Sequence, residues 1–175
     1  MNCFVGVDVG TTNVKALAMP PDLDQILAHA SAPVTTLHSE PGYAEQDPAE
    51  IWSAFVQVIS EISREVAKGG HTITHVTFCT AMHSLLPMDA DGTPLGNAIL
   101  WSDNRAEAQA DVLRGTQAKL GNAIYKETGT PIHPMIPLCK LAWLREHDPR
   151  LLHRTARFGS IKEFLWYKLT GEFEI

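Results

Sequence analysis

The sequence predicts an α/β fold in which helices flank a mixed β-sheet. Three observations support this fold class. Short apolar runs rich in β-branched residues open the chain, an amphipathic helical stretch follows them, and a further strand-like run comes after that stretch. Strands and helices in this order are typical of α/β proteins, whose sheets carry helices on their faces.

Three strands are expected at the start of the chain. Residues 3–9 form an apolar run whose length and composition are typical of a buried strand. Residues 14–19 form a second strand, and residues 10–13 are the turn between the two. Residues 26–34 are compatible with a third strand, so the opening of the chain predicts a β-meander.

A long helix is expected to follow and to end at Gly69. Asp47 is suited to the N-cap, Pro48 to the first helical position and Glu50 to a capping box. Apolar residues then recur at helical spacing along one stripe: Ile51, Phe55, Val58, Ile59, Ile62 and Val66. Residues 73–79 return to strand.

The second half of the chain predicts a hairpin-like pair and then helices. Residues 85–88 and 98–101 would pair around a turn at 89–92. The helices are expected at residues 105–120, 123–128, 138–147 and 161–169. No linker marks a second domain, and residues 172–175 resemble the start of a further strand or loop. We therefore expect one partial domain over residues 1–175.

The composition is that of a soluble globular protein. The chain has 175 residues, of which 45% are hydrophobic and 19% charged. Its net charge of −6 argues against nucleic acid as a partner, since nucleic-acid binders usually carry a basic patch. No apolar run approaches the ~20 residues of a membrane span. The three cysteines are Cys3, Cys79 and Cys139, an odd number. The first two lie in apolar runs, where cysteine usually acts as a small hydrophobe. This usage predicts reduced cysteines and a cytoplasmic location.

The first chemical signal is a carboxylate in an apolar strand. Asp8 is followed by Gly10, Thr11 and Thr12, and Lys15 lies on the next strand. Glycine allows a tight turn, and the hydroxyl and N–H groups around it suit a phosphate. A carboxylate that binds hydrated Mg²⁺, next to donors that bind phosphate, is an arrangement suited to ATP. An ordinary hairpin, with Asp8 bonded to turn amides, explains the pattern equally well.

Residues 7–15 resemble the first phosphate motif of the FGGY carbohydrate kinases. These enzymes share the ribonuclease H-like fold of actin and the heat-shock chaperone ATPases. The resemblance implies ATP and Mg²⁺ as cofactors, with Asp8 near the metal and the turn of Gly10, Thr11 and Thr12 facing the γ-phosphate. On this motif alone, an actin-like or chaperone-like ATPase is an alternative.

Two further segments resemble the sugar site of this family. Met82 and His83 follow a strand and are similar to the pair that touches the sugar in xylulose-type members. A lone histidine is more often structural, but the resemblance favours a sugar contact here. Trp101, Asp103 and Arg105 are similar to the residues at the mouth of the sugar site, where carboxylate and guanidinium groups bind hydroxyls. Helix capping by Asp103, with a solvated Arg105, is the alternative.

The sugar is expected to be gluconate. Residues 81–84, 101–105 and 160–164 resemble gluconate kinases, whereas xylulose kinases tend to have Gln at the position of Ala81. Gluconate is an anion, so a cationic group is expected in its pocket; His83, Arg105 and Lys162 are candidates. Ser160 and Glu163 also form a capping box, which is the stronger explanation for that segment.

The resemblance implies ATP-dependent phosphorylation of D-gluconate to 6-phosphogluconate. The aspartate that acts as base in the family belongs to a later motif, so we assign no catalytic residue up to Ile175 and expect this chain alone to be inactive. An incomplete domain exposes apolar surface, and a homodimer is one way to cover it. A xylulose or other sugar kinase, and a non-catalytic sugar-binding module, are the alternatives.

Overall fold

The computed structural model describes residues 1–173, which fold into two compact units. The first unit comprises Met1–Thr36 and Asp47–Ala81, and the second comprises Leu37–Gln46 and the described residues from Met82 onward. No linker composition marks the points where the chain passes from one unit to the other. The prediction for residues 172–175 falls partly outside the described residues.

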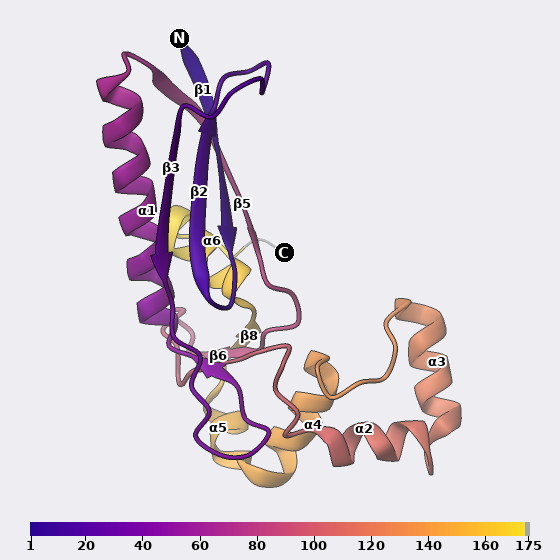
Figure 1. Ribbon diagram of the computed structural model, residues 1–175. Coiled ribbons are helices and arrows are strands. Elements are labelled where there is room, and N and C mark those ends of the chain that lie inside the picture. The colour runs from indigo at the N-terminus through magenta and orange to yellow at the C-terminus, as the bar shows by residue number, and fades with distance from the viewer. Residues whose placement is uncertain (174–175) are drawn as a thin grey trace. The chain divides into compact units, whose positions relative to one another are not determined.

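The first unit contains a four-stranded mixed sheet in the order β3-β2-β1-β5. Strands β1 (Asn2–Val9), β2 (Asn13–Met19) and β3 (Ala28–Pro33) form an antiparallel meander, and β5 (Thr72–Thr80) pairs with β1 in parallel. Figure 1 shows the four strands side by side with helix α1 (Pro48–Lys68) along them. The predicted meander, helix and following strand are confirmed.

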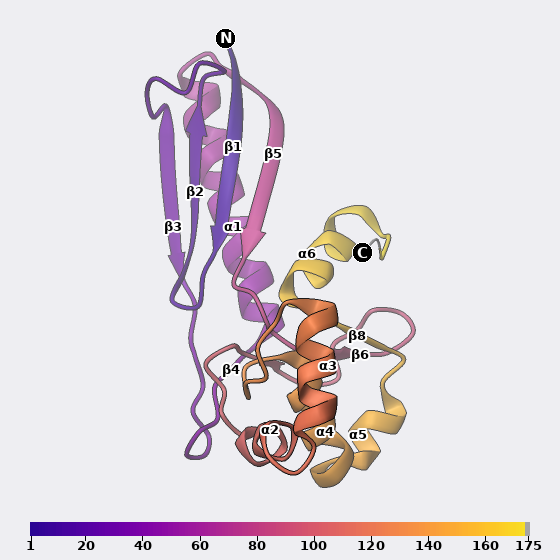
Figure 2. The ribbon, with the colours of Figure 1, turned by 90° about the vertical axis from the view of Figure 1, so that its right-hand side faces the viewer.

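Helix α1 covers one face of this sheet, as Figure 2 shows. Burial alternates along β1, where Cys3, Val5, Val7 and Val9 are buried, because successive side chains of a strand point to opposite faces. On β2 and β3 the buried positions are mostly alanines, which let the helix approach closely. The opposite face carries the exposed residues of the strands, Asp8 among them.

Asp47 caps α1 as predicted, but Glu50 does not complete the capping box. The carboxylate of Asp47 accepts a hydrogen bond from the backbone N–H of Ala49 at 2.8 Å. Glu50 instead accepts hydrogen bonds from the backbone N–H and the hydroxyl of Thr35, at 3.1 and 2.9 Å. It therefore ties the helix to the segment that follows β3.

The second unit contains two short antiparallel ladders rather than the predicted hairpin. Strand β4 (Glu45–Gln46) pairs with β7 (Ala98–Ile99), and β6 (Leu86–Met88) pairs with β8 (Arg157–Gly159). The predicted partners meet only at an isolated bridge between Leu85 and Ile99. The hairpin prediction was wrong because both strands pair with segments distant in sequence.

The helices of the second unit are α2 (Glu107–Arg114), α3 (Ala118–Thr128), α4 (Pro137–His147), α5 (Pro149–Arg154) and α6 (Ile161–Thr170). The predicted helix over 105–120 was wrong, because the chain breaks at Gly115, whose φ of −106° and ψ of −96° are not helical. Helices α4 and α6 were predicted, and the capping box of Ser160 and Glu163 is present. Within residues 1–173, none of the helices is both long enough and apolar enough to cross a membrane.

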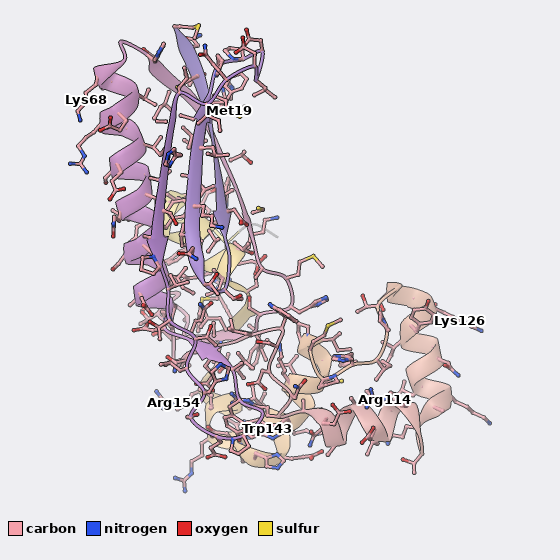
Figure 3. The ribbon with its side chains drawn as sticks, viewed as in Figure 1. Met19, Lys68, Arg114, Lys126, Trp143 and Arg154 are labelled. Carbon is pink, nitrogen blue, oxygen red and sulfur yellow. The ribbon has the colours of Figure 1, made fainter. Side chains whose placement is uncertain are left out.

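Helix α4 contributes side chains to two apolar clusters of the second unit. One cluster contains Ala106, Ala110, Ile136 and Cys139, and the other contains Leu85, Ile99 and Leu144. Trp143, labelled in Figure 3, packs against both. The helix thus packs against Leu85, Ile99 and Ala106, which lie next to the two segments that resemble the sugar site.

Candidate functional site

Asp8 and Lys15 lie opposite each other on β1 and β2, on the face of the sheet away from α1. Residues opposed in an antiparallel pair have Cβ atoms about 4.5–5.5 Å apart. Both side chains are exposed, and no ion pair within 4.0 Å joins them among the described residues. A carboxylate and an ammonium group therefore face solvent side by side at this edge of the turn.

The turn between these strands is held by backbone hydrogen bonds. The N–H of Gly10 donates to the carbonyl oxygen of Asn13 at 3.0 Å, and a Cβ at Gly10 would lie 3.2 Å from that oxygen. A side chain here would crowd that oxygen, which favours glycine at this position. The carbonyl oxygens of Thr11 and Thr12 accept hydrogen bonds from the hydroxyl of Thr36 and the N–H of Val34. Because the Gly10 N–H is used within the turn, it is not among the donors that could face a phosphate.

Cys79 is a third polar group at this position, and its environment was not predicted. The parallel register places Cys79 of β5 beside Asp8, and its thiol donates to Asp8 Oδ1 at 3.5 Å. Cys79 is exposed and bonded to a carboxylate, so the expectation that it acts as a small hydrophobe was wrong, whereas Cys3 is buried. Partial desolvation, and then the hydrogen bond and charge of Asp8, raise the pKa of the Cys79 thiol.

A hollow of about 810 Å³ lies over this face of the sheet. Its lining includes Asp8, Lys15 and Cys79, together with apolar side chains such as Phe4 and Leu17. Met19, labelled in Figure 3, also lines it, at the other end of β2. The polar groups therefore sit at the margin of a largely apolar surface.

In the second unit, Met82 and His83 form a turn with an unusual backbone conformation. His83 has a φ of 62°, in the left-handed region, which costs of order 1–3 kcal/mol for a residue other than glycine. Met82 is 71% exposed. The hydroxyl of Ser84 next to them is buried and accepts a hydrogen bond from the N–H of Ile161 at 3.1 Å. The turn is thus anchored at the start of α6 while Met82 faces solvent.

Asp103 and Arg105 form a buried ion pair. Arg105 Nε donates to Asp103 Oδ1 and Oδ2 at 2.9 and 3.0 Å, and Nη2 donates to Asp103 Oδ2 at 2.8 Å. Nη2 also donates to Glu45 Oε1 at 2.5 Å. The guanidinium carbon lies 3.7 Å from the centre of the Tyr43 ring. Trp101, by contrast, is 48% exposed.

This arrangement contradicts a solvated Arg105 with Asp103 as a helix cap. Asp103 is fully buried and accepts a hydrogen bond from the N–H of Ala44 at 2.7 Å, while α2 begins at Glu107 without a side-chain cap. Burial alone would lower the pKa of Arg105, but its hydrogen bonds to Asp103 and Glu45 outweigh burial and raise that pKa above the ordinary value. The guanidinium therefore stays charged and points inward.

Lys140 is a buried residue that sequence reasoning missed. Its Nζ donates to the carbonyl oxygens of His83 and Leu100 at 2.6 and 2.7 Å, with a longer contact of 3.4 Å to that of Ile99. Burial lowers the pKa of Lys140 to about 8. Its one sequence signal is its spacing, since it lies one helical turn before the buried Leu144 on the same face. Lys162, a predicted candidate, is exposed in the first turn of α6.

Comparison with known proteins decides the family. Residues 3–175 match the N-terminal domain of the FGGY family of carbohydrate kinases. The chain belongs to this family. Among its curated FGGY relatives, a gluconokinase from Bacillus subtilis is 32% identical over 172 residues, which are 98% of this chain and 33% of that protein. A xylulose kinase from Staphylococcus epidermidis is 30% identical over 166 residues, 95% of this chain and 32% of that protein.

Solved FGGY structures share the fold of this chain. The crystal structure of gluconate kinase from Lactobacillus acidophilus matches with a TM-score of 0.91 at 28% identity, over 98% of this chain and 34% of that one. The predicted mixed sheet of the actin-like ATPase fold is confirmed. The chain spans about a third of the length of the curated relatives it matches.

Proposed function

We propose that this chain is the N-terminal part of an ATP-dependent sugar kinase that phosphorylates D-gluconate to 6-phosphogluconate. Two side chains carry the proposal. Met82 and Trp101 are 71% and 48% exposed, so both are accessible to a ligand, and both belong to the segments that resemble the sugar site. Exposed apolar groups next to polar ones suit the mixed faces of a sugar. The 32% identity to a gluconokinase supports gluconate as the substrate.

In this proposal the first unit holds the phosphates. Asp8 faces solvent beside Lys15, so a carboxylate for the metal and a cation for a phosphate oxygen stand next to each other. A single carboxylate fits Mg²⁺, because this ion keeps several waters and is commonly bound through one or two carboxylates and the phosphates of the nucleotide. ATP supplies the γ-phosphoryl group, and Mg²⁺ neutralises the charge on its oxygens. The hydroxyl groups of Thr11 and Thr12 are the proposed donors from the turn.

In the second unit, Met82, His83 and Trp101 would contact the sugar. Asp103 and Arg105 are assigned to hold this segment, because both side chains are almost fully buried in their own ion pair. We assign no catalytic base among these residues. The free thiols of Cys3, Cys79 and Cys139 support a reducing compartment such as the cytoplasm. A homodimer stays a prediction, which the mass of the protein in solution would test.

The deciding experiment measures ADP release by the natural gene product with gluconate, xylulose and glycerol in parallel. Turnover with gluconate alone is the expected result. Preference for xylulose would keep the kinase and replace the substrate, and the identity to a xylulose kinase makes that the second candidate. Absence of any sugar dependence would favour a sugar-binding module or an ATPase that is indifferent to sugar. The chain of residues 1–175 alone is expected to release no ADP.

Asp8→Asn tests the phosphate assignment in the same assay. We expect a loss of turnover of about 100-fold or more, because the carboxylate that would hold Mg²⁺ is removed, and Mg²⁺ neutralises the charge on the phosphate oxygens. Asp22→Asn is the matched control, since Asp22 is an exposed aspartate in the loop after β2. Equal activity of the two variants would remove Asp8 from the proposal.

A further inference from the structure

The ammonium group of Lys140 joins the two segments that carry the proposed sugar contacts. The side chain reaches from α4 to the carbonyl oxygens of His83 and Leu100, at 2.6 and 2.7 Å. Leu100 directly precedes Trp101, and His83 directly follows Met82. One nitrogen thus links the backbone of both segments to a third element of the second unit.

This lysine is buried without a carboxylate in direct contact. Its exposed fraction is 0%, and no ion pair within 4.0 Å involves it among the described residues. A buried ammonium is unfavourable unless hydrogen bonds satisfy it, and here carbonyl oxygens alone provide the short ones. A methionine would occupy similar space without a charge. What the lysine adds over a methionine is therefore its hydrogen bonds to the two carbonyl groups.

Lys140 bonds to a backbone segment whose conformation is unfavourable without support from its surroundings. His83 is in the left-handed region, and such conformations persist only where the surroundings over-determine them. Among the described residues, the hydrogen bond from Lys140 is the one that the His83 carbonyl accepts. The Leu100 carbonyl also accepts the N–H of Asp103 at 3.2 Å, so the same oxygen connects Lys140 to the Asp103 turn.

We propose that Lys140 is a positioning residue for the sugar: its ammonium fixes the carbonyl groups of His83 and Leu100, so that Met82, His83 and Trp101 meet the substrate in one arrangement. Lys140 itself contacts no ligand in this scheme. The proposal rests on the proposed function as a sugar kinase.

Protonation of Lys140 provides a test that needs no mutation. The titratable groups that act on it are Asp103, Arg105 and the thiol of Cys139, and its ammonium contacts the backbone of His83. An ammonium has three N–H donors, whereas the neutral amine has two and a lone pair that repels a carbonyl oxygen. Because its pKa is about 8, the hold weakens as the pH rises through that value. The KM for the sugar should therefore rise above pH 8 while the KM for ATP does not.

The mutational test compares Lys140→Met with Lys126→Met in the natural gene product. Lys126 is an exposed lysine of α3, labelled in Figure 3, and serves as the matched control. We expect Lys140→Met to raise the sugar KM by about 10- to 100-fold, since displacements of an ångström have effects of that size, and to leave the ATP KM unchanged. It should also abolish the rise of the sugar KM above pH 8. An unchanged sugar KM, or equal increases for sugar and ATP, would overturn the proposal.

Two further measurements cover the remaining outcomes. If Lys140→Met does not fold, the pH profile of the unaltered enzyme decides, and a flat sugar KM through pH 8 overturns the proposal. If the unaltered protein phosphorylates no sugar, the proposed function fails and the sugar role of Lys140 fails with it. Amide hydrogen exchange then tests whether Lys140 fixes the backbone. Faster exchange at residues 82–84 and 100–105 in Lys140→Met, and not in Lys126→Met, would support this role. Equal exchange in the two variants would refute it.

Discussion

Arg105 binds the carboxylate of Asp103 through two nitrogens, Nε at 2.9 and 3.0 Å and Nη2 at 2.8 Å. The two side chains are 5% and 0% exposed. The pair turns the guanidinium inward, over the ring of Tyr43 and onto Glu45. A residue whose type and motif indicate anion binding therefore acts, in this structure, as the centre of a buried network.

Arg105→Ala should destabilise the protein strongly. Removing one partner of a buried pair leaves an uncompensated charge on Asp103, which typically costs about 3–5 kcal/mol. The midpoint of urea unfolding measures this change. Arg114→Ala is the control, because Arg114 binds Glu107 and Asp111 on the surface and its loss should have little effect. Similar midpoints for the two variants would contradict the network.

Trp101→Ala and Met82→Ala should separate substrate binding from stability. Met82 is 71% exposed, so its truncation removes little buried surface and should change the unfolding free energy by about 0.5 kcal/mol or less. Trp101 is 48% exposed, so its truncation also removes buried apolar surface and should cost about 1 kcal/mol or more. The KM for gluconate should rise in each variant. A large loss of stability, or an unchanged KM, would mean that these residues belong to the scaffold alone.

Asp47→Ala should destabilise helix α1. The Asp47 carboxylate accepts the N–H of Ala49 at 2.8 Å, and loss of such a cap typically costs about 1 kcal/mol. Asp47→Asn retains an oxygen acceptor and should recover most of that loss. Thermal unfolding of the two variants makes the comparison, and equal melting temperatures would show that the cap contributes little.

The stability of the protein should increase with pH on account of Lys140. In the folded state its pKa is about 8, below the ordinary value of 10.5, so between these values the unfolded chain binds more protons. The free energy of unfolding then rises with pH, by at most about 1.4 kcal/mol per unit for one proton. Lys140→Met lacks this contribution. The difference between the two proteins should grow from pH 8 to 10, and parallel curves would contradict it.

Cys79 should react slowly with alkylating reagents, and Asp8→Asn should make it faster. Partial desolvation and the neighbouring carboxylate raise the pKa of the thiol, which disfavours the reactive thiolate. Removing the charge of Asp8 lowers that pKa. Mass spectrometry of the native chain should find the label on Cys79 and not on the buried Cys3 or Cys139. Asp22→Asn should leave the rate unchanged, and an equal acceleration there would exclude a local effect of Asp8.

The first unit could largely be predicted from the sequence because its signals are local. The strands over residues 3–9 and 14–19 are apolar runs separated by a glycine turn, and α1 carries a cap, a proline and an apolar stripe. The second unit could not. Strands β4 and β7 have two residues each, too few for any periodicity. They pair although they lie far apart in the sequence, and no local pattern predicts such a pairing.

The sequence indicates candidate residues for the site but not their contacts. Asp8, Met82, Trp101 and Arg105 all stand out by type and neighbourhood, but their partners depend on register and tertiary packing. Cys79 meets Asp8 because β5 lies parallel to β1, and Lys140 meets His83 because its side chain reaches from α4 to the turn. Neither relation can be derived from spacing along the chain.

Lys140 holds backbone oxygens, and this has an evolutionary consequence. Every residue type has a carbonyl group, so the support at His83 and Leu100 does not depend on which side chains surround it. Met82 and Trp101 project from that support into solvent. Substitutions at these exposed positions can accumulate without dismantling the framework beneath them. Under the proposed sugar role, changes at these two positions would alter the preference for a sugar and leave the support at His83 and Leu100 intact.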